Sequence, residues 1–319
     1  MNILIIGGTR FLGKLLVEKF ILSKNINLTV LSRNPLVNQF KCNTLNYEKK
    51  EGLKHLKGIH FDLVYDFLAY DREDIINIKR YLNFSKYLFV STVWIKKLNL
   101  NNSIDELVND LNRKQISGLR PTTKKYLLGK RDAENTLCDL FDKKLFNIIR
   151  LPIFFGINDH TKRLSFYLSR LSKNEPLIIV NSGENICQIA YVEDLAKLLY
   201  HFSEEKIIKT IINALPNNGI SVNNFIKTLK KYNNSNSKII HVSDYILKKE
   251  FPEYLDTEPL WKENFIETGN NNIFKELNFT LTDIDKWIKI VSKKTNKDYF
   301  CTKEFIYKEK KIINEIIYK

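Results

Sequence analysis

The amino-acid sequence predicts an α/β protein in which a doubly wound parallel sheet is joined to a smaller, mostly helical lobe. Short apolar runs alternate with segments of helical periodicity over the first 156 residues, and a glycine-rich turn follows the first run. Beyond Gly156 the alternation loosens, and residues 220–319 have mostly helical patterns. Alternating strands and helices fold into a parallel sheet that helices cover on both faces.

The chain begins with a strand, a glycine turn and a helix. Residues 2–6 (NILII) form an apolar run typical of a strand buried on both faces, and apolar residues recur at helical spacing from Leu12 to Phe20. Residues 27–33 are expected to form a second strand. Such a unit of about 30 residues is of the kind that holds nucleotides.

The same alternation predicts the remaining elements. We expect strands at 61–70, 87–95, 145–156, 176–180 and 210–215, and helices at about 72–82, 123–140 and 163–173, with a short strand and an acid-started helix within 187–202. The first domain is therefore expected over 1–156 and completed by about 186–215. The lobe is expected from 157–185 and 216–319.

Composition limits the classes of function. The 319 residues carry a net charge of +15, which would ordinarily suggest nucleic acid or an acidic membrane as partner. The lysine excess accompanies heavy Asn and Ile usage throughout, so we interpret it as compositional bias that favours, at most, an anionic substrate. Four widely spaced cysteines predict neither a metal site nor disulfides, and no apolar run is long enough for a membrane span. A cytoplasmic protein is expected.

The turn over residues 7–13 (GGTRFLG) keeps the outer glycines of a dinucleotide-binding turn, with Arg10 in place of the middle glycine. The first glycine permits a sharp turn, the last permits close packing of the helix, and backbone N–H groups at the helix start face the pyrophosphate. A plain connection between strand and helix is the alternative, which the position of the turn disfavours. The Arg10 guanidinium can bind a phosphate beyond the pyrophosphate.

The end of the second strand favours NADP over NAD. A site for NAD usually carries Asp or Glu there to bind the ribose hydroxyls, and such a carboxylate would repel a 2′-phosphate. The sequence has Ser32, Arg33 and Asn34 instead. We therefore expect NADP, with Arg10, Ser32 and Arg33 around its 2′-phosphate, and NAD as the second choice.

Tyr-x-x-x-Lys spacing occurs three times, and position distinguishes one pair. Only Tyr126 and Lys130 begin a helix between two expected sheet strands, whereas the pairs at 299/303 and 307/311 lie in the C-terminal tail. Residues four apart share a helix face, so Lys130 can lie beside both the Tyr126 hydroxyl and the cofactor ribose. A nearby ammonium favours phenolate and lowers a phenol pKa, which permits proton exchange near neutral pH.

The strand YLFVST ends in two hydroxyls, Ser91 and Thr92, at the sheet edge where ligands of such folds bind. A purely structural hydroxyl is the alternative at a strand end. Beside the Tyr126/Lys130 pair, we expect Thr92 to donate to a substrate oxygen, with Ser91 as the second choice.

These motifs resemble the short-chain dehydrogenase/reductase superfamily, specifically its sugar-nucleotide epimerase/dehydratase branch. The glycine turn, VST at 90–92, Tyr126-x-x-x-Lys130, RLPIFFG at 150–156 and QIAYVEDLA at 188–196 occur in family order over about two thirds of the chain. The form GGTRFLG is similar to an atypical subgroup that includes chloroplast stem-loop-binding proteins.

The resemblance implies hydride transfer between nicotinamide C4 and a sugar carbon, with Tyr126 as acid/base, Thr92 polarising the oxygen and Lys130 holding the ribose. It also implies a homodimer. Cofactor contacts are expected from Gly7, Thr9, Arg10, Phe11, Leu12, Gly13, Ser32, Arg33, Asn34, Leu68, Ala69, Ser91 and Pro152. The loop DFLAY lacks the small pair often found beside the adenosine, so Leu68 and Ala69 must take that role.

Substrate contacts are expected mainly after RLPIFFG. Arg163 and Arg170 could meet a diphosphate, and a solvated basic helix face is an equal alternative. Gln188 is expected to line the pocket. Trp261 covers a sugar or base, or packs in the core. Trp94, near a position where relatives often carry VY, is included as a substrate contact.

The leading functional hypothesis is NADPH-dependent reduction of a nucleotide-linked 4-keto sugar, for example a dTDP-4-keto-6-deoxyhexose. A reductase draws on the NADPH pool, whereas an epimerase recycles tightly bound NAD. A 4,6-dehydratase needs an acid next to the catalytic threonine, and Val93 and Trp94 follow Thr92 here. A sugar-nucleotide epimerase is the second hypothesis. An RNA-binding protein on the same scaffold is the third, although no aromatic and basic RNA motif is present.

Overall fold

The computed structural model describes residues 1–33, 42–46, 51–98, 121–204, 210–216, 218–260, 273–295, 297–299 and 301–317. Asn34 and Trp261, two residues expected to bind ligand, lie outside the described residues. The chain divides into two compact units. Unit 1 holds Met1–Pro152, Glu193–Ala214 and Lys275–Phe279, and unit 2 holds Ile153–Val192, Leu215–Phe274 and Thr280–Lys319.

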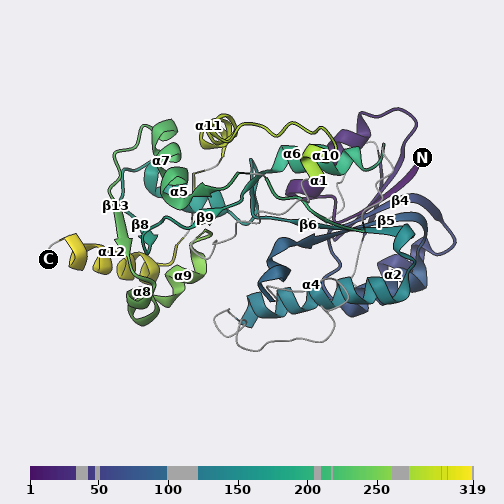
Figure 1. Ribbon diagram of the computed structural model, residues 1–319, viewed down its shortest axis with the longest axis horizontal. Coiled ribbons are helices and arrows are strands. Elements are labelled where there is room, and N and C mark those ends of the chain that lie inside the picture. The colour runs from purple at the N-terminus through teal and green to yellow at the C-terminus, as the bar shows by residue number, and fades with distance from the viewer. Residues whose placement is uncertain are drawn as a thin grey trace. The chain divides into compact units, whose positions relative to one another are not determined.

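A seven-stranded sheet forms the centre of unit 1 (Figure 1). Its strands, in spatial order, are β11 (Ile211–Asn213), β6 (Phe146–Leu151), β5 (Asn83–Thr92), β4 (His60–Asp66), β1 (Asn2–Ile6), β2 (Asn27–Ser32) and β3 (Asn43–Asn46). Every neighbouring pair is parallel. The predicted parallel α/β fold is therefore confirmed. The order reverses between β1 and β4, and ligands of such sheets bind beyond the carboxyl ends of the strands at that point.

Helices cover both faces of this sheet. The helical segments of unit 1 are α1 (Phe11–Ile21), η1 (Gly52–Leu56), α2 (Arg72–Tyr81), η2 (Val93–Leu98), α4 (Pro121–Leu140), η3 (Lys143–Leu145) and α6 (Val192–His201). Figure 1 shows α1 and α6 on one face and α2 and α4 on the other. The core under α4 joins Phe89 and Ile148 of the sheet to Ala133 and Leu137 of the helix. The apolar face of α4 therefore fixes its position on the sheet.

Three predicted strand boundaries differ from the structure for local reasons. The strand expected at 61–70 ends at Asp66, because that carboxylate accepts hydrogen bonds from the next backbone N–H groups and turns the chain. The strand expected at 87–95 spans Asn83–Thr92, since η2 begins at Val93. The strand expected at 145–156 is interrupted at Pro152, which has no N–H to donate to a ladder.

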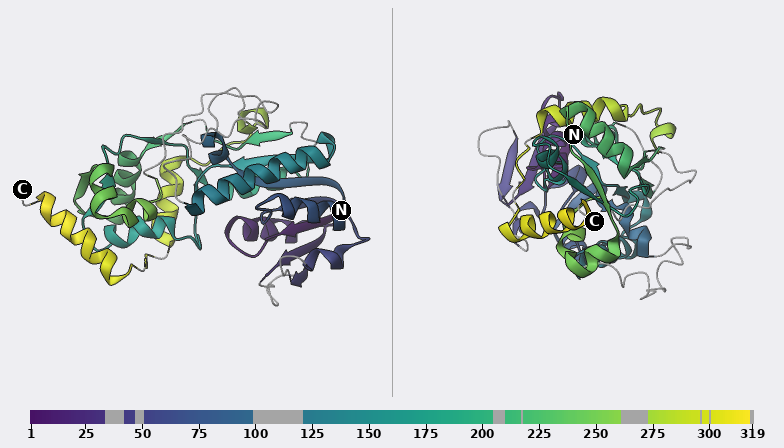
Figure 2. Two further views of the ribbon diagram at one scale, coloured as in Figure 1. Left: turned by 90° about the horizontal axis from the view of Figure 1, so that it is seen from below. Right: turned by 90° about the vertical axis from the view of Figure 1, so that its left-hand side faces the viewer.

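Unit 2 is mostly helical, and its described residues form three two-stranded sheets. Its strands are β7 (Phe154–Phe155), β8 (Leu177–Val180), β9 (Ile186–Cys187), β10 (Ala190–Tyr191), β12 (Ile220–Ser221) and β13 (Ile239–Val242). Its helices are α5 (Arg163–Leu171), α7 (Val222–Asn233), α8 (Asp244–Glu250), α9 (Pro252–Thr257), α11 (Ile284–Lys294) and α12 (Lys303–Ile317), and α10 (Ile273–Glu276) spans the boundary with unit 1. Figure 2 shows α12 in yellow.

The sequence predicts a first boundary at 156 and a returning segment at about 186–215, whereas unit 1 has them at 152 and 193–214. The return of Lys275–Phe279 to unit 1 was not expected. Within the described ranges, no helix combines the length and apolar character needed to cross a membrane. The same ranges hold no group of three or more His, Cys, Asp or Glu side chains arranged to hold a metal ion.

Candidate cofactor and catalytic site

Two glycines bring the first turn of α1 against the end of β1. Gly7 has a φ of +93°, and its N–H donates to the Leu31 carbonyl at 2.8 Å. A Cβ at Gly7 would lie 2.8 Å from Leu68 Cγ, and a Cβ at Gly13 would lie 2.5 Å from the Gly7 oxygen. Neither site has room for a side chain, so the sequence GGTRFLG folds as the expected close turn.

The start of α1 has the properties of an anion site. Arg10 is the N-cap residue in extended conformation, and its side chain does not cap the first turn. Phe11 follows with a φ of +44°, which is uncommon for a residue with a side chain. Thr9 Oγ1 and Ser32 Oγ share a hydrogen bond of 2.6 Å, which ties the turn to the end of β2. A helix N-terminus held this way favours a negatively charged group.

The loop after β4 is built on a buried carboxylate. Asp66 is 2% exposed, and it accepts hydrogen bonds from Leu68 N, Ala69 N and the Tyr87 hydroxyl at 2.7–2.8 Å. Burial raises the pKa of Asp66, while these three bonds favour its ionised form. The backbone of Leu68 and Ala69 is thereby fixed next to the glycine turn.

Tyr126 and Lys130 both lie on α4, and their exposures differ sharply. Tyr126 is 41% exposed, whereas Lys130 is 2% exposed. Lys130 Nζ donates to the carbonyls of Ala69 at 2.7 Å and Val90 at 2.8 Å. The lysine therefore joins α4 to the chain beyond β4 and to the end of β5. Burial lowers the pKa of Lys130 to about 8, although acidic groups in the same unit oppose the shift.

A buried ion pair anchors α4 one turn further on. Glu134 accepts from Arg150 of β6, with 3.0 Å between Arg150 Nε and Glu134 Oε1, and both side chains are buried. The sequence prediction missed this pair. The sequence did carry a signal for Glu134, because Tyr126, Lys130 and Glu134 are spaced four residues apart and so share one face of the helix.

The hydroxyls at the end of β5 have different surroundings. Thr92 Oγ1 accepts from Trp94 N at 3.3 Å and is partly accessible. Ser91 Oγ is buried and has no hydrogen-bond partner among the described residues. Trp94, expected as a substrate contact, packs against Leu127 of α4. Pro152 is buried directly after β6.

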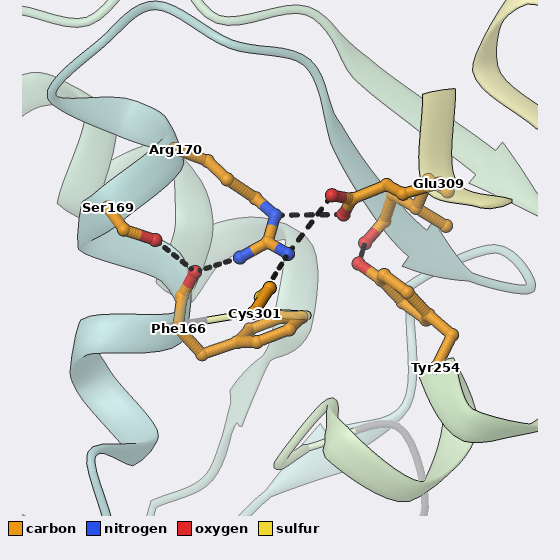
Figure 3. Close-up of polar contacts among 7 residues, drawn as sticks. Phe166, Ser169, Arg170, Tyr254, Cys301 and Glu309 are labelled. Atoms are coloured by element: carbon orange, nitrogen blue, oxygen red, sulfur yellow. Dashed lines mark hydrogen bonds and ion pairs between the residues drawn. The ribbon is translucent and has the colours of Figure 1, made fainter. Parts of the chain in front are cut away.

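The residues expected to bind substrate from unit 2 are held by other contacts. Arg170 is expected to meet a diphosphate or to lie on a solvated face, whereas the structure buries its side chain in an ion pair. Its side chain is 5% exposed and pairs with Glu309 of α12, at 2.8 Å between Nε and Oε1, while Nη1 donates to the Phe166 carbonyl (Figure 3). Arg163 is half-exposed and lies 3.8 Å from Asp159. Gln188 is buried, and its Nε2 donates to the Pro216 carbonyl.

Comparison with known proteins shows which of them are similar to this chain. No family model matches the chain. The curated chloroplast stem-loop binding protein of 41 kDa b from Arabidopsis thaliana is 24% identical over 345 aligned positions, covering 92% of this chain and 85% of that protein.

Solved structures are similar to this chain in three dimensions. An NAD-dependent NDP-hexosamine 5,6-dehydratase of tunicamycin biosynthesis has a TM-score of 0.67 at 15% identity, covering 92% of this chain and 97% of that one. The UDP-glucose 4-epimerase of Thermotoga maritima, solved with UDP-glucose, has a TM-score of 0.65 at 16% identity, covering 97% and 99%. A UDP-glucuronic acid 4-epimerase of Bacillus cereus, solved with NAD, has a TM-score of 0.64 at 15% identity, covering 92% and 98%. This chain therefore has the fold of the NAD-dependent sugar-nucleotide epimerases and dehydratases.

Proposed function

We propose that this protein is a nicotinamide-dependent oxidoreductase that acts on a nucleotide sugar, with Tyr126 as its acid/base. The observation that carries the proposal is the placement of Lys130. Its ammonium binds the carbonyls of Ala69 and Val90, beyond β4 and at the end of β5. This is the sheet edge where ligands of parallel α/β folds bind, and the glycine turn opens onto the same edge from β1.

The residues present fit a dinucleotide. Gly7 and Gly13 leave no space for a side chain, so the first turn of α1 packs closely against the end of β1, as in turns whose helix N-terminus binds a phosphate. The buried Ser91 hydroxyl, unpaired within the described part of the chain, supports a ligand at the end of β5. When bound, a nicotinamide supplies a hydride donor or acceptor.

Three side chains of the protein would then have separate catalytic roles. Tyr126, exposed on the first turns of α4, gives or takes the proton of the sugar oxygen. Thr92 donates its hydroxyl hydrogen to the same oxygen while its Oγ1 accepts from Trp94 N. Lys130 holds a positive charge beside the tyrosine, which favours phenolate.

The cofactor we propose is NADP, with NAD second. Ser32 is buried and bonded to Thr9, so its part is to position the turn, and the charge for a 2′-phosphate comes from Arg10 and Arg33. The Arg33 guanidinium acts near this edge, because it opposes the rise in the pKa of Tyr70 that burial causes. The solved neighbours are described with NAD, so this preference needs its own test.

The reaction we propose is reduction of a nucleotide-linked 4-keto sugar. Epimerisation of a nucleotide sugar is the second candidate, favoured by solved 4-epimerases with this fold. RNA binding is the third, favoured by the name of the curated relative. Arg163 and Gln188 stay predictions for substrate binding, as do the homodimer and the cytoplasmic location.

A panel of nucleotide sugars separates these candidates. We expect NADPH consumption, followed by absorbance, with a nucleotide 4-keto sugar, and a loss of about 10²–10⁴-fold in kcat for Tyr126→Phe. Conversion of UDP-glucose or a related sugar without added cofactor, with NAD released on denaturation, would favour the epimerase instead.

The matched control is Tyr245→Phe, because Tyr245 is 74% exposed on α8. This variant is expected to turn over like the wild type. Salt-sensitive binding of a stem-loop RNA that Tyr126→Phe leaves intact, with no turnover of any sugar, would replace the proposal with the RNA-binding candidate.

A further inference from the structure

The loop that follows β4 lies unusually close to α4. A Cβ at Gly129 would meet the Tyr70 carbonyl oxygen at 2.5 Å, so only glycine permits this approach. The next residue of the helix, Lys130, donates to the Ala69 carbonyl, and Tyr70 N donates to Asp74 of α2 at 2.8 Å. Contacts on both sides of Tyr70 therefore fix its backbone.

The Tyr70 ring lies beside the Tyr126/Lys130 pair. Lys130 Nζ is 4.8 Å from the centre of the Tyr70 ring and 4.7 Å from the centre of the Phe89 ring. The Tyr70 and Tyr126 ring centres are 6.1 Å apart. Phe89 is fully buried, whereas Tyr70 is 39% exposed. Tyr70 is therefore the ring on the solvent side of the ammonium.

Resting on the proposed function of Tyr126 and Lys130, we propose that Tyr70 is a positioning residue that covers the Lys130 ammonium and keeps water from it. The Ala69 and Val90 carbonyls use two of the three donors of the ammonium. By excluding water, the Tyr70 ring reserves the remaining donor for an oxygen of the cofactor or substrate. A ring face suits this task because it attracts a cation without accepting its proton.

The charged groups around Lys130 come from several elements. Asp66 of β4, Glu134 of α4 and Asp74 of α2 favour the ammonium, and Arg33, which follows β2, acts on Tyr70. Burial nevertheless outweighs these acids and lowers the pKa of Lys130 to about 8. Removing the Tyr70 ring loses its attraction for the cation but lets water reach the ammonium. Because burial is the largest cause of the low pKa, the pKa of Lys130 should rise towards its ordinary value of 10.5.

The test is an NMR titration of lysine side chains in the cofactor-free protein, with Lys130→Met used to assign the signal. Tyr70→Leu is expected to raise the Lys130 midpoint by about one pH unit or more, because it removes the ring. Tyr70→Phe, which keeps the ring, and Tyr245→Leu, a matched change at an exposed tyrosine of α8, are expected to leave the midpoint at the wild-type value.

Kinetics give a second readout. Tyr70→Leu is expected to lower kcat about tenfold with KM for the nucleotide sugar unchanged, while Tyr70→Phe retains turnover. An unchanged Lys130 midpoint in Tyr70→Leu would overturn the inference. If Tyr70→Leu does not fold, Gly129→Ala displaces the same loop, and the same upward shift is required. If the wild type turns over no nucleotide sugar, the proposed function fails, and the titration still decides the role of Tyr70.

Discussion

Two buried cations, Lys130 in unit 1 and Arg170 in unit 2, have opposite surroundings. The Lys130 ammonium donates to two neutral carbonyls and lies between two aromatic rings. The Arg170 guanidinium makes a two-pronged contact with the Glu309 carboxylate and lies over the Phe166 ring (Figure 3). Burial lowers the pKa of Lys130. Burial also opposes the charge of Arg170, but Glu309, Tyr254 and Cys301 together outweigh it and raise the pKa of Arg170.

Under the proposed function, this difference separates a site residue from a structural one. A buried charge bonded to a carboxylate in good geometry is neutralised, and it holds two elements together. A buried charge that is bonded only to neutral dipoles has no counter-ion to neutralise it. Such a group titrates near neutral pH and is typical of functional sites. On this ground we propose Lys130 as a site residue and Arg170 as a structural one.

The largest expected effect is on turnover. Lys130→Met should lower kcat/KM by about 10²–10⁴-fold, because the charge beside Tyr126 is lost. Arg170→Met should keep wild-type turnover per folded molecule. Steady-state kinetics with NADPH and the active sugar from the panel measures both. A loss of catalysis in folded Arg170→Met equal to that of Lys130→Met would break the comparison.

The next effect is on stability. Arg170→Met leaves the Glu309 carboxylate buried without its partner, so the free energy of unfolding should fall by about 3–5 kcal/mol. Urea unfolding, followed by circular dichroism, measures the loss. The double variant Arg170→Met/Glu309→Leu is the control and should recover part of it, because no uncompensated charge remains. A single variant as stable as the wild type would show that the pair contributes nothing.

A third effect is the pH dependence that Lys130 gives to stability. Its folded pKa of about 8 lies below the ordinary value of 10.5, so between these values the unfolded chain binds more protons. The free energy of unfolding should therefore rise with pH over this window, relative to Lys130→Met, by at most about 3 kcal/mol. Below pH 8 the difference between the two proteins should be constant. A difference that does not change from pH 8 to 10.5 would mean that Lys130 titrates normally.

The smallest expected effect concerns an exposed cation. Arg33 follows β2 and is exposed, and in the proposed site its guanidinium binds the 2′-phosphate of the cofactor. Arg33→Ala should weaken NADPH binding about tenfold and leave NADH binding unchanged. Fluorescence titration of the two reduced cofactors gives the dissociation constants. Equal weakening of both would remove Arg33 from the proposed 2′-phosphate site.

Local patterns in the sequence predicted most of unit 1. The alternation of strands and helices gave the parallel sheet, because each element shows its own periodicity. The glycine turn and the Tyr126/Lys130 spacing are also local patterns, because each lies within seven consecutive residues. The structure places these parts at the ends of β1, β4 and β5, where a parallel sheet brings them.

Contacts between distant residues could not be predicted from one sequence. Arg170 and Glu309 are 139 residues apart, so the spacing of Arg163 and Arg170 suggested a ligand site instead. Tyr70, in the loop after β4, lies against Gly129 of α4, and no local sequence pattern predicts this contact. Such pairs are set by how the helices pack on the sheet, which periodicity alone does not specify.

Binding of the reduced cofactor to Lys130→Met and Arg170→Met tests the central claim most directly. The fluorescence of NADPH on binding reports affinity without any sugar substrate. We predict that Lys130→Met binds NADPH at least tenfold more weakly than the wild type and that folded Arg170→Met binds it equally well. Wild-type affinity in Lys130→Met would contradict the account, since the buried lysine would then hold only its own chain together.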